Sequence, residues 1–123
     1  DQSFAKKFGF TAVDRTDNGY ELLALSFDGS IPRFAAGAKQ MTVDAKGLTV
    51  YYDLQCPYIP QRVEKLREHC ALNGITAQFI LVDSLEKAKA LPCVFNNWAV
   101  FYDGKFVTVN QIDAARLEKL IKR

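Results

Sequence analysis

The feature that most constrains the fold is the stretch over residues 47–72, in which an apolar strand pattern runs into a cysteine-proline turn and then into a helical pattern. The strand pattern covers residues 48–54, and the turn opens with Cys56, Pro57 and Tyr58. A cysteine between a strand and a helix lies near the free N–H groups and the dipole of the helix N-terminus, which favour a thiolate. Cys56 is therefore the candidate catalytic residue.

The helix after this turn is predicted over about residues 59–72, ending at Asn73-Gly74. Its apolar positions recur at i, i+4, i+7 and i+11, which is one helix face. These positions are Ile59, Val63, Leu66 and Cys70. If the helix begins with Cys56 as N-cap and Pro57 as its first residue, Pro60 removes a backbone hydrogen bond from it, so a later start is the alternative.

Further along the chain the patterns predict a strand over 75–82, a helix over about 84–91, a hairpin over 98–109 and a helix over 111–122. Asp83 with Glu86 resembles a capping box, Asn110 is the expected cap of the last helix, and Asp103-Gly104 is typical of a two-residue type I′ turn. This order calls for a right-handed parallel crossover followed by an antiparallel pair. The expected fold class is α/β, with a mixed four-stranded sheet and three helices.

The first 46 residues have a different character. Residues 3–8 are predicted to end a helix, and strands over 10–13 and 20–27 flank the turn at 17–19. A helix end and a two-stranded hairpin are marginal on their own in water. Residues 28–46 combine glycine, proline and small residues without an apolar period, which is typical of a linker. We expect three parts: 1–27, the linker 28–46, and 47–123.

Composition narrows the function classes. The 123 residues suffice for one packed core, and a formal net charge of +2 with scattered lysines and arginines provides no basic stripe for nucleic acid. No apolar run approaches the roughly 18 to 20 residues that span a bilayer, and the start is no secretion signal, so a cytoplasmic location is expected. The cysteines are irregularly spaced and accompanied by one histidine, which predicts neither a disulfide framework nor a metal site.

Residues 47–123 resemble the thioredoxin superfamily. The tetrapeptide Cys56-Pro57-Tyr58-Ile59 is similar to the Cys-Pro-Tyr-Cys motif of glutaredoxins, with Ile59 in place of the second cysteine. The resemblance implies a thioredoxin-like fold and a cis-proline loop facing the cysteine, for which Pro92 is the nearest candidate. Without a second cysteine, thiol chemistry would be of the monothiol kind, with glutathione or a similar thiol as co-substrate.

Residues 1–27 resemble the C-terminal end of GNAT-type acetyltransferases, because residues 4–10 match a helix that ends in Gly-Phe and residues 20–27 match a last long strand. Together the parts resemble a GNAT acetyltransferase with a thioredoxin-like tail of the YoaP-like kind. The resemblance implies an upstream acetyltransferase domain as partner and acetyl-CoA for the full-length parent. The Gly-rich pyrophosphate loop has no counterpart here, and Ala5 stands where a general-acid Tyr often lies, so this chain alone is not expected to acetylate.

Two functions stay open at this point. In the first, the tail is an accessory binding domain that presents residues 56–60 to a substrate, a peptide or the catalytic domain. In the second, Cys56 is the nucleophile of a monothiol redox enzyme. The binding residues expected beside Cys56 are Pro57, Tyr58, Pro92, Cys93 and Trp98. Cys93 either approaches Cys56 or is a loop or core thiol, whereas Cys70 is expected in the core. The N-terminal hairpin could also join copies of the chain into a homo-oligomer.

Overall fold

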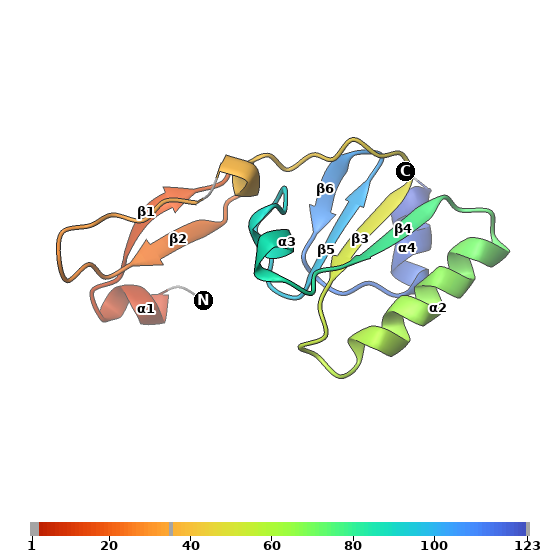
Figure 1. Ribbon diagram of the computed structural model, residues 1–123, viewed down its shortest axis with the longest axis horizontal. Helices are drawn as coiled ribbons and strands as arrows, with labels where there is room; N and C mark the ends of the chain where they lie inside the picture. Colours follow the sequence, from red (N-terminus) through yellow and green to blue (C-terminus); the bar gives the residue numbers. More distant parts are fainter. Residues whose placement is uncertain (1–2, 35, 123) are drawn as a thin grey trace.

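The computed structural model describes residues 3–34 and 36–122 (Figure 1). The elements are α1 (Ser3–Lys7), β1 (Thr11–Arg15), β2 (Glu21–Ala24), the 3-10 helix η1 (Ala36–Lys39), β3 (Leu48–Tyr52), α2 (Ile59–Leu72), β4 (Ala77–Leu81), α3 (Leu85–Lys89), β5 (Trp98–Tyr102), β6 (Lys105–Thr108) and α4 (Ala114–Ile121). After residue 47 the helices and strands follow the predicted order. α2 has the predicted bounds, and the other elements are slightly shorter than predicted.

The main sheet has four strands in the order β4-β3-β5-β6. β3 and β4 are parallel and are connected through α2, whereas β3 pairs antiparallel with β5, and β5 with β6. The predicted mixed sheet with a parallel crossover is therefore confirmed. Asp103 and Gly104 both have positive φ, 49° and 86°, as the predicted type I′ turn requires.

One face of this sheet packs against α2 and α4. Successive strand residues point to opposite faces, so Leu48 and Val50 of β3 share this face with Trp98 and Val100 of β5. The apolar stripe predicted for α2, namely Ile59, Val63, Leu66 and Cys70, is entirely buried against them. We call this the helix-side core. Fully burying one such side chain stabilises the fold by about 1.5–3 kcal/mol.

The opposite face of the sheet holds a smaller loop-side core. Ala99 and Phe101 of β5 are buried there together with Cys93 from the preceding loop. The Phe101 ring lies edge-on to those of Tyr51 and Phe106, with centroids 5.9 Å and 5.6 Å away. This core is closed by the loop before β5 and by the segment that leads into β3, because Val43 packs against it.

The N-terminal hairpin forms a separate two-stranded antiparallel sheet, β1-β2, which lies with α1 at one end of the molecule (Figure 1). The Tyr20 ring at its turn lies edge-on to Phe106 of β6, with centroids 6.4 Å apart. Asp14 accepts hydrogen bonds from the Phe34 N–H and the Lys39 ammonium, at 2.7 Å and 2.6 Å. Lys39 holds the pKa of the Asp14 carboxyl below its usual value.

The segment predicted as a linker is docked over its second half. The Met41 N–H donates to the Pro92 carbonyl at 2.7 Å, and the Val43 N–H donates to the Gly104 carbonyl at 2.9 Å. Thr42 pairs antiparallel with Lys105 of β6. These bonds cover the outer edge of β6, which would otherwise be a free sheet edge. The domain boundary near residue 46 stays a prediction.

Two predicted helix caps are wrong. The side chain of Ser84, not Asp83, accepts from the third N–H of α3, and Asp83 instead forms an ion pair with Lys87 at 2.8 Å. Asp113, not Asn110, is the N-cap of α4. Ser84 and Asp113 each directly precede their helix with extended backbone angles, as is typical of an N-cap residue.

Candidate functional site

The turn that carries Cys56 lies between the end of β3 and the start of α2. The Cys56 carbonyl accepts from the Ile59 N–H at 3.1 Å, and Tyr58 is the N-cap of α2, so Cys56 and Pro57 precede the helix. Of the two helix starts considered from the sequence, the one with Cys56 as N-cap and Pro57 as first helical residue is excluded, and the later start is correct. Pro60 is the second residue of α2, where an N–H has no intrahelical partner, so it does not interrupt the helix.

The three thiols lie in different surroundings. Cys56 is half-buried at the margin of the helix-side core, Cys70 is buried within that core, and Cys93 is buried in the loop-side core. Burial raises the pKa of the Cys93 thiol to about 11 and also raises that of Cys70, to which Glu118 adds. Because Cys56 and Cys93 pack into cores on opposite faces of the sheet, Cys93 is a core thiol rather than a partner of Cys56.

The predicted binding residues divide into two groups. Pro57 and Tyr58 are exposed beside Cys56, Tyr58 at 70%. Pro92, Cys93 and Trp98 are buried. The Pro92 carbonyl accepts from the chain before β3, and no peptide bond within 3–34 or 36–122 is cis. The structure therefore brings only Pro57 and Tyr58 to the surface beside Cys56.

Trp98 is part of the helix-side core. Its side chain is fully buried, and its indole N–H has no hydrogen-bond partner among the described residues. It lies opposite Tyr52 in the β3-β5 register, near the turn that carries Cys56. Its contacts are thus those of a packing residue, and it does not line the groove described next.

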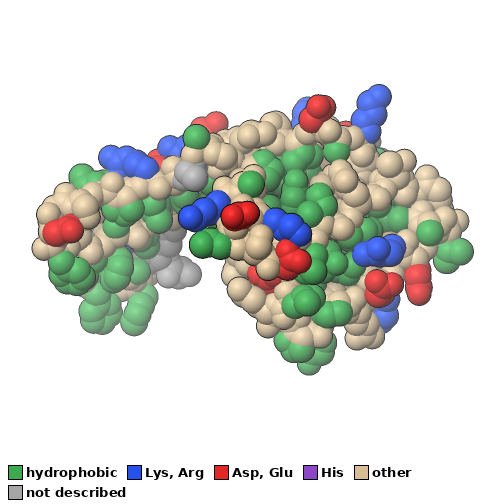
Figure 2. All heavy atoms as spheres, viewed as in Figure 1, with side chains coloured by type: hydrophobic (Ala, Val, Ile, Leu, Met, Phe, Trp, Pro, Cys, Tyr) green, Lys and Arg blue, Asp and Glu red, His purple; other side chains and the backbone are tan. Residues whose placement is uncertain are grey.

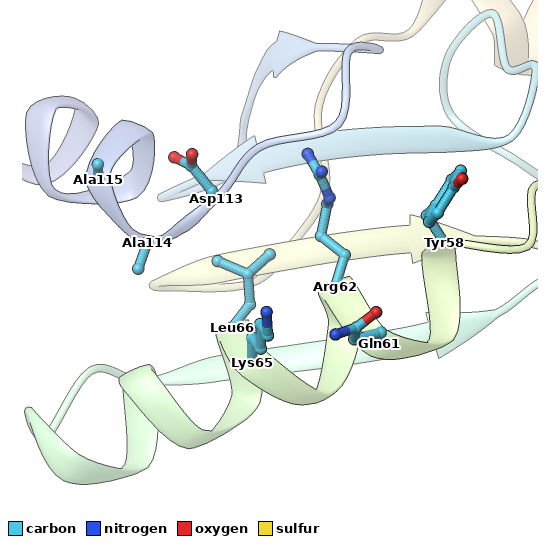
Figure 3. Close-up of a pocket in the computed structure, with 8 residues that line it drawn as sticks. All are labelled: Tyr58, Gln61, Arg62, Lys65, Leu66, Asp113, Ala114 and Ala115. Atoms are coloured by element: carbon cyan, nitrogen blue, oxygen red, sulfur yellow. The ribbon is translucent and has the colours of Figure 1, made fainter.

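A cavity of about 440 Å³ opens between the first turns of α2 and α4 (Figure 3). It is lined by Tyr58, Gln61, Arg62, Lys65, Leu66, Asp113, Ala114 and Ala115. A neighbouring cavity of about 310 Å³ shares Arg62 and Asp113 and adds Arg116 to the wall. Together the two form one surface groove, which we call the α2-α4 groove, and Tyr58 connects it to the Cys56 turn.

The α2-α4 groove is electropositive. Neither Arg62, Lys65 nor Arg116 has an ion-pair or side-chain hydrogen-bond partner in the described part of the chain. The one carboxylate in its wall, Asp113, already accepts from the Arg116 N–H at 2.9 Å. In Figure 3 the Arg62 side chain extends from α2 toward the segment that enters α4. The groove thus holds three cationic side chains without a partner and one carboxylate that already accepts a hydrogen bond. This excess of positive charge favours an anionic ligand.

The spacing of α2 and α4 is fixed farther along both helices. His69 Nε2 lies 2.7 Å from Glu118 Oε1, and Leu66 and Ala114 line the same cavity. The second of these pairs lies nearer the N-terminus of both helices than the first. α2 and α4 are therefore parallel, and both N-termini lie at the groove. The positive ends of both helix dipoles therefore add to its potential.

The α2-α4 groove was not predicted from the sequence. Tyr58, Arg62 and Lys65 recur at i, i+4 and i+7, so they form one polar face of α2, and this spacing was the available signal. No helix that the structure describes is long and apolar enough to cross a membrane. Within the same described ranges, no group of three or more His, Cys, Asp or Glu residues is arranged to hold a metal ion.

Comparison with known proteins adds two matches. Residues 77–119 match the YoaP-like family model. These residues run from β4 into α4 and include Asp113, Ala114, Ala115 and Arg116 of the groove. A curated protein of Bacillus subtilis (strain 168), named uncharacterized N-acetyltransferase YoaP, is 33% identical over an alignment of 123 residues, which covers 98% of this chain and 49% of that protein.

The chain thus spans about half the length of the curated relative that it matches. The two matches support a relationship with an acetyltransferase-related family. No solved structure gives a significant match.

Proposed function

We propose that residues 47–122 form a thioredoxin-like accessory domain of an N-acetyltransferase and that this domain binds an anionic ligand in the α2-α4 groove. The thioredoxin-like assignment is supported by the order of elements, the parallel β3-β4 pair and the cysteine-proline turn ahead of α2. The acetyltransferase context is supported by the similarity to the Bacillus subtilis protein, which is named as an N-acetyltransferase. Function rests on the site and not on the fold alone.

The observation that carries the binding proposal is the set of three unpaired cations in one groove. Unpaired arginine side chains that converge on a cavity are typical of sites for carboxylate or phosphate, to which Arg can donate two parallel hydrogen bonds. Ala114 and Ala115 line the cavity at the start of α4, and a helix N-terminus favours anions because its first N–H groups have no intrahelical partner. The exposed Tyr58 ring offers an apolar contact to the rest of a small molecule or peptide.

The binding proposal is tested with S-methylglutathione, which carries two carboxylates but cannot exchange its sulfur. Calorimetric titration at low salt is expected to show binding that weakens as salt is added. Arg62→Gln and Arg116→Gln are each expected to weaken it by about tenfold or more, since a charge-assisted hydrogen bond contributes roughly 1.5–3 kcal/mol.

The matched control is Arg67→Gln, which removes the same charge from the same helix outside the groove, where Arg67 lies over the Phe79 ring. Its affinity should equal that of the unmodified chain. If Arg62→Gln, Arg116→Gln and Arg67→Gln all lower the affinity for S-methylglutathione equally, then the net charge of the chain, and not the groove, determines binding.

A second candidate is monothiol exchange at Cys56, favoured by its being the one thiol of the three that is not buried. The Cys56 thiolate would attack the glutathione sulfur of a mixed disulfide between glutathione and another thiol, forming a Cys56–glutathione disulfide and releasing the other thiol as its thiolate. A glutathione thiolate would then attack the Cys56–glutathione disulfide, which regenerates the Cys56 thiolate and forms glutathione disulfide. Ile59, fully buried at the position of the second motif cysteine, leaves no intramolecular resolving thiol there.

Limited alkylation at pH 8 is expected to label Cys56 first. With a pKa of about 11, only about one Cys93 thiol in a thousand is a thiolate at that pH, and burial blocks access to both Cys93 and Cys70. Peptide mass analysis identifies the labelled site, and Cys56→Ser should remove the fast phase while the chain stays folded. If Cys70 is labelled as fast as Cys56, the redox candidate is wrong, whereas the binding proposal is unaffected.

Acetyl-CoA is proposed only for a longer parent protein. The described residues do not fit it, because the two helices of eight residues or more open with Tyr58-Ile59-Pro60 and Asp113-Ala114, and neither start is a glycine-rich turn that could cradle a pyrophosphate. We therefore derive no acetyl-transfer step from this chain. We propose the upstream acetyltransferase domain as a partner of this chain.

A further inference from the structure

The α2-α4 groove has two halves of different chemistry, which share Arg62 and Asp113 in their walls. In the cavity of about 440 Å³ an aromatic ring and aliphatic side chains form part of the wall, namely Tyr58, Leu66, Ala114 and Ala115. In the cavity of about 310 Å³ most of the other lining side chains are polar, namely Thr108, Asn110, Gln111 and Arg116. We call these the apolar half and the polar half. A ligand that fills both halves is amphipathic.

The cation that both halves share is half-buried. Arg62 has no carboxylate partner among the residues that the structure describes. Elsewhere on α2, Arg67 lies 3.7 Å from Glu64, and on α3, Lys87 lies 2.8 Å from Asp83. Figure 2 shows Lys and Arg side chains beside Asp and Glu side chains over both of these helices. Because burying an unpaired charge is costly, an anion gains more at Arg62 than at a cation on the open surface.

The segment that enters α4 carries unpaired hydrogen-bond donors. The backbone N–H groups of Gln111, Ile112 and Asp113 have no acceptor within the described ranges, and the side-chain amides of Asn110 and Gln111 have no partner there either. The backbone at Asp113 is extended, with φ −106° and ψ −178°. An extended segment with unpaired N–H groups can pair with the carbonyl groups of another extended chain. These donors therefore favour a ligand that has a peptide backbone.

Asp113 favours a ligand that carries a donor beside its negative charge. Its Oδ1 accepts from the Arg116 N–H at 2.9 Å, and its Oδ2 has no partner in the described part of the chain. The last residue of a peptide carries three groups on one Cα, which are a carboxylate, an N–H and a side chain. They match a cation, a free carboxylate oxygen and an apolar cavity that share one wall. A free peptide C-terminus is thus the ligand that uses all three features.

We propose that the α2-α4 groove binds the free C-terminus of a partner polypeptide that ends in an apolar residue. The terminal carboxylate lies between Arg62 and Arg116, the last N–H donates to Asp113, and the last side chain fills the apolar half. Carbonyl groups of the preceding residues accept from the N–H groups of residues 111–113. This inference rests on the proposed function of the groove as an anion site, and it names the class of ligand.

The test is a calorimetric titration of the full chain, at low salt, with the acetylated tetrapeptide Gly-Ser-Gly-Leu. The peptide with a free carboxylate is expected to bind at least tenfold more tightly than the peptide with a C-terminal amide. The amide of acetylated Gly-Asp-Gly-Leu carries the same net charge in a side chain and should bind as weakly as the first amide. Acetylated Gly-Ser-Gly-Gly with a free carboxylate should bind about tenfold more weakly than the Leu peptide, because it leaves the apolar half empty.

Variants of the chain locate the bound peptide. Arg62→Gln and Arg116→Gln are each expected to remove most of the difference between the free acid and the amide, whereas Arg67→Gln should leave it unchanged. Ala115→Leu fills the apolar half from an exposed position and should remove the preference for Leu over Gly at the peptide end. These side chains belong to neither core, so the variants should keep the melting temperature of the unmodified chain.

Three results would overturn the inference. They are equal affinities for the free acid and the amide, tighter binding of the Asp-containing amide than of the free acid, and displacement of the bound free acid by an equal concentration of inorganic phosphate. If S-methylglutathione still binds in any of these cases, the groove remains an anion site and only the choice of ligand is wrong. If neither S-methylglutathione nor the free acid binds, the proposed function fails as well.

Discussion

Replacing Trp98 with Ala is expected to lower the free energy of unfolding by about 3–5 kcal/mol, as truncation of a fully buried aromatic side chain does. Trp98 fills the helix-side core from β5, against the buried faces of β3 and α2, and the cavity left behind cannot collapse between a sheet and a helix. Urea denaturation measures the loss. Because small domains are stable by only about 5–15 kcal/mol, this substitution approaches global unfolding.

Two variants make the Trp98 prediction specific. Leu72→Ala, at an exposed position, should change stability by no more than about 0.5 kcal/mol. Trp98→Phe should cost clearly less than Trp98→Ala, because it keeps an aromatic ring in the core and removes an indole N–H that has no partner. A loss below about 1 kcal/mol in Trp98→Ala would contradict the core assignment.

Gly47→Ala is expected to destabilise the fold by about 2–5 kcal/mol. Gly47 has φ 75°, a conformation that costs an L-residue roughly 1–2 kcal/mol. An added Cβ would also lie 2.3 Å from the Thr76 carbonyl oxygen, and relieving such an overlap typically costs about 1–3 kcal/mol more. The same carbonyl accepts the Leu48 N–H at 2.9 Å, so movement away from Gly47 disturbs the start of the β3-β4 pair.

Gly74→Ala is the matched control for Gly47→Ala. Gly74 also has a positive φ, 65°, but nothing lies within 4 Å of a Cβ built on it. Its cost should be limited to the backbone conformation, about 1–2 kcal/mol. The difference between the two variants in urea denaturation isolates the steric contact with Thr76. Equal costs would show that β3 and β4 are not held this closely.

Much of the fold could be predicted because the relevant signals are local. The stripe from Ile59 to Cys70 repeats with helical period, and Asp103-Gly104 between two apolar runs allows one tight hairpin. Helix caps were less predictable. Asp83 and Ser84 are both residue types that can cap α3, and Asn110 and Asp113 are both types that can cap α4. The sequence alone does not decide which of each pair directly precedes the helix.

The site was predictable only in part, because it depends on which elements become neighbours. The turn at Cys56 could be located from sequence, since strand, proline and helix follow directly. The groove joins α2 to α4, about fifty residues apart, and no local pattern brings Arg62 next to Asp113. Trp98, expected as a binding residue, is buried, and Cys93, left open between an approach to Cys56 and a loop or core position, lies in the loop-side core. Neither sequence position decides between a packed interior and a ligand-facing surface.

A heteronuclear NMR titration of the labelled Cys56→Ser chain tests the α2-α4 groove as a ligand site. The ligand is S-methylglutathione, a thioether that cannot exchange with the two remaining thiols, Cys70 and Cys93. We expect chemical-shift changes at the amides of Tyr58, Arg62, Ala114 and Ala115 that saturate with one bound ligand per chain. These changes should be absent in the Arg62→Gln, Arg116→Gln variant. Shifts spread over residues outside α2 and α4, or no shifts at these amides, would contradict a ligand site in the α2-α4 groove.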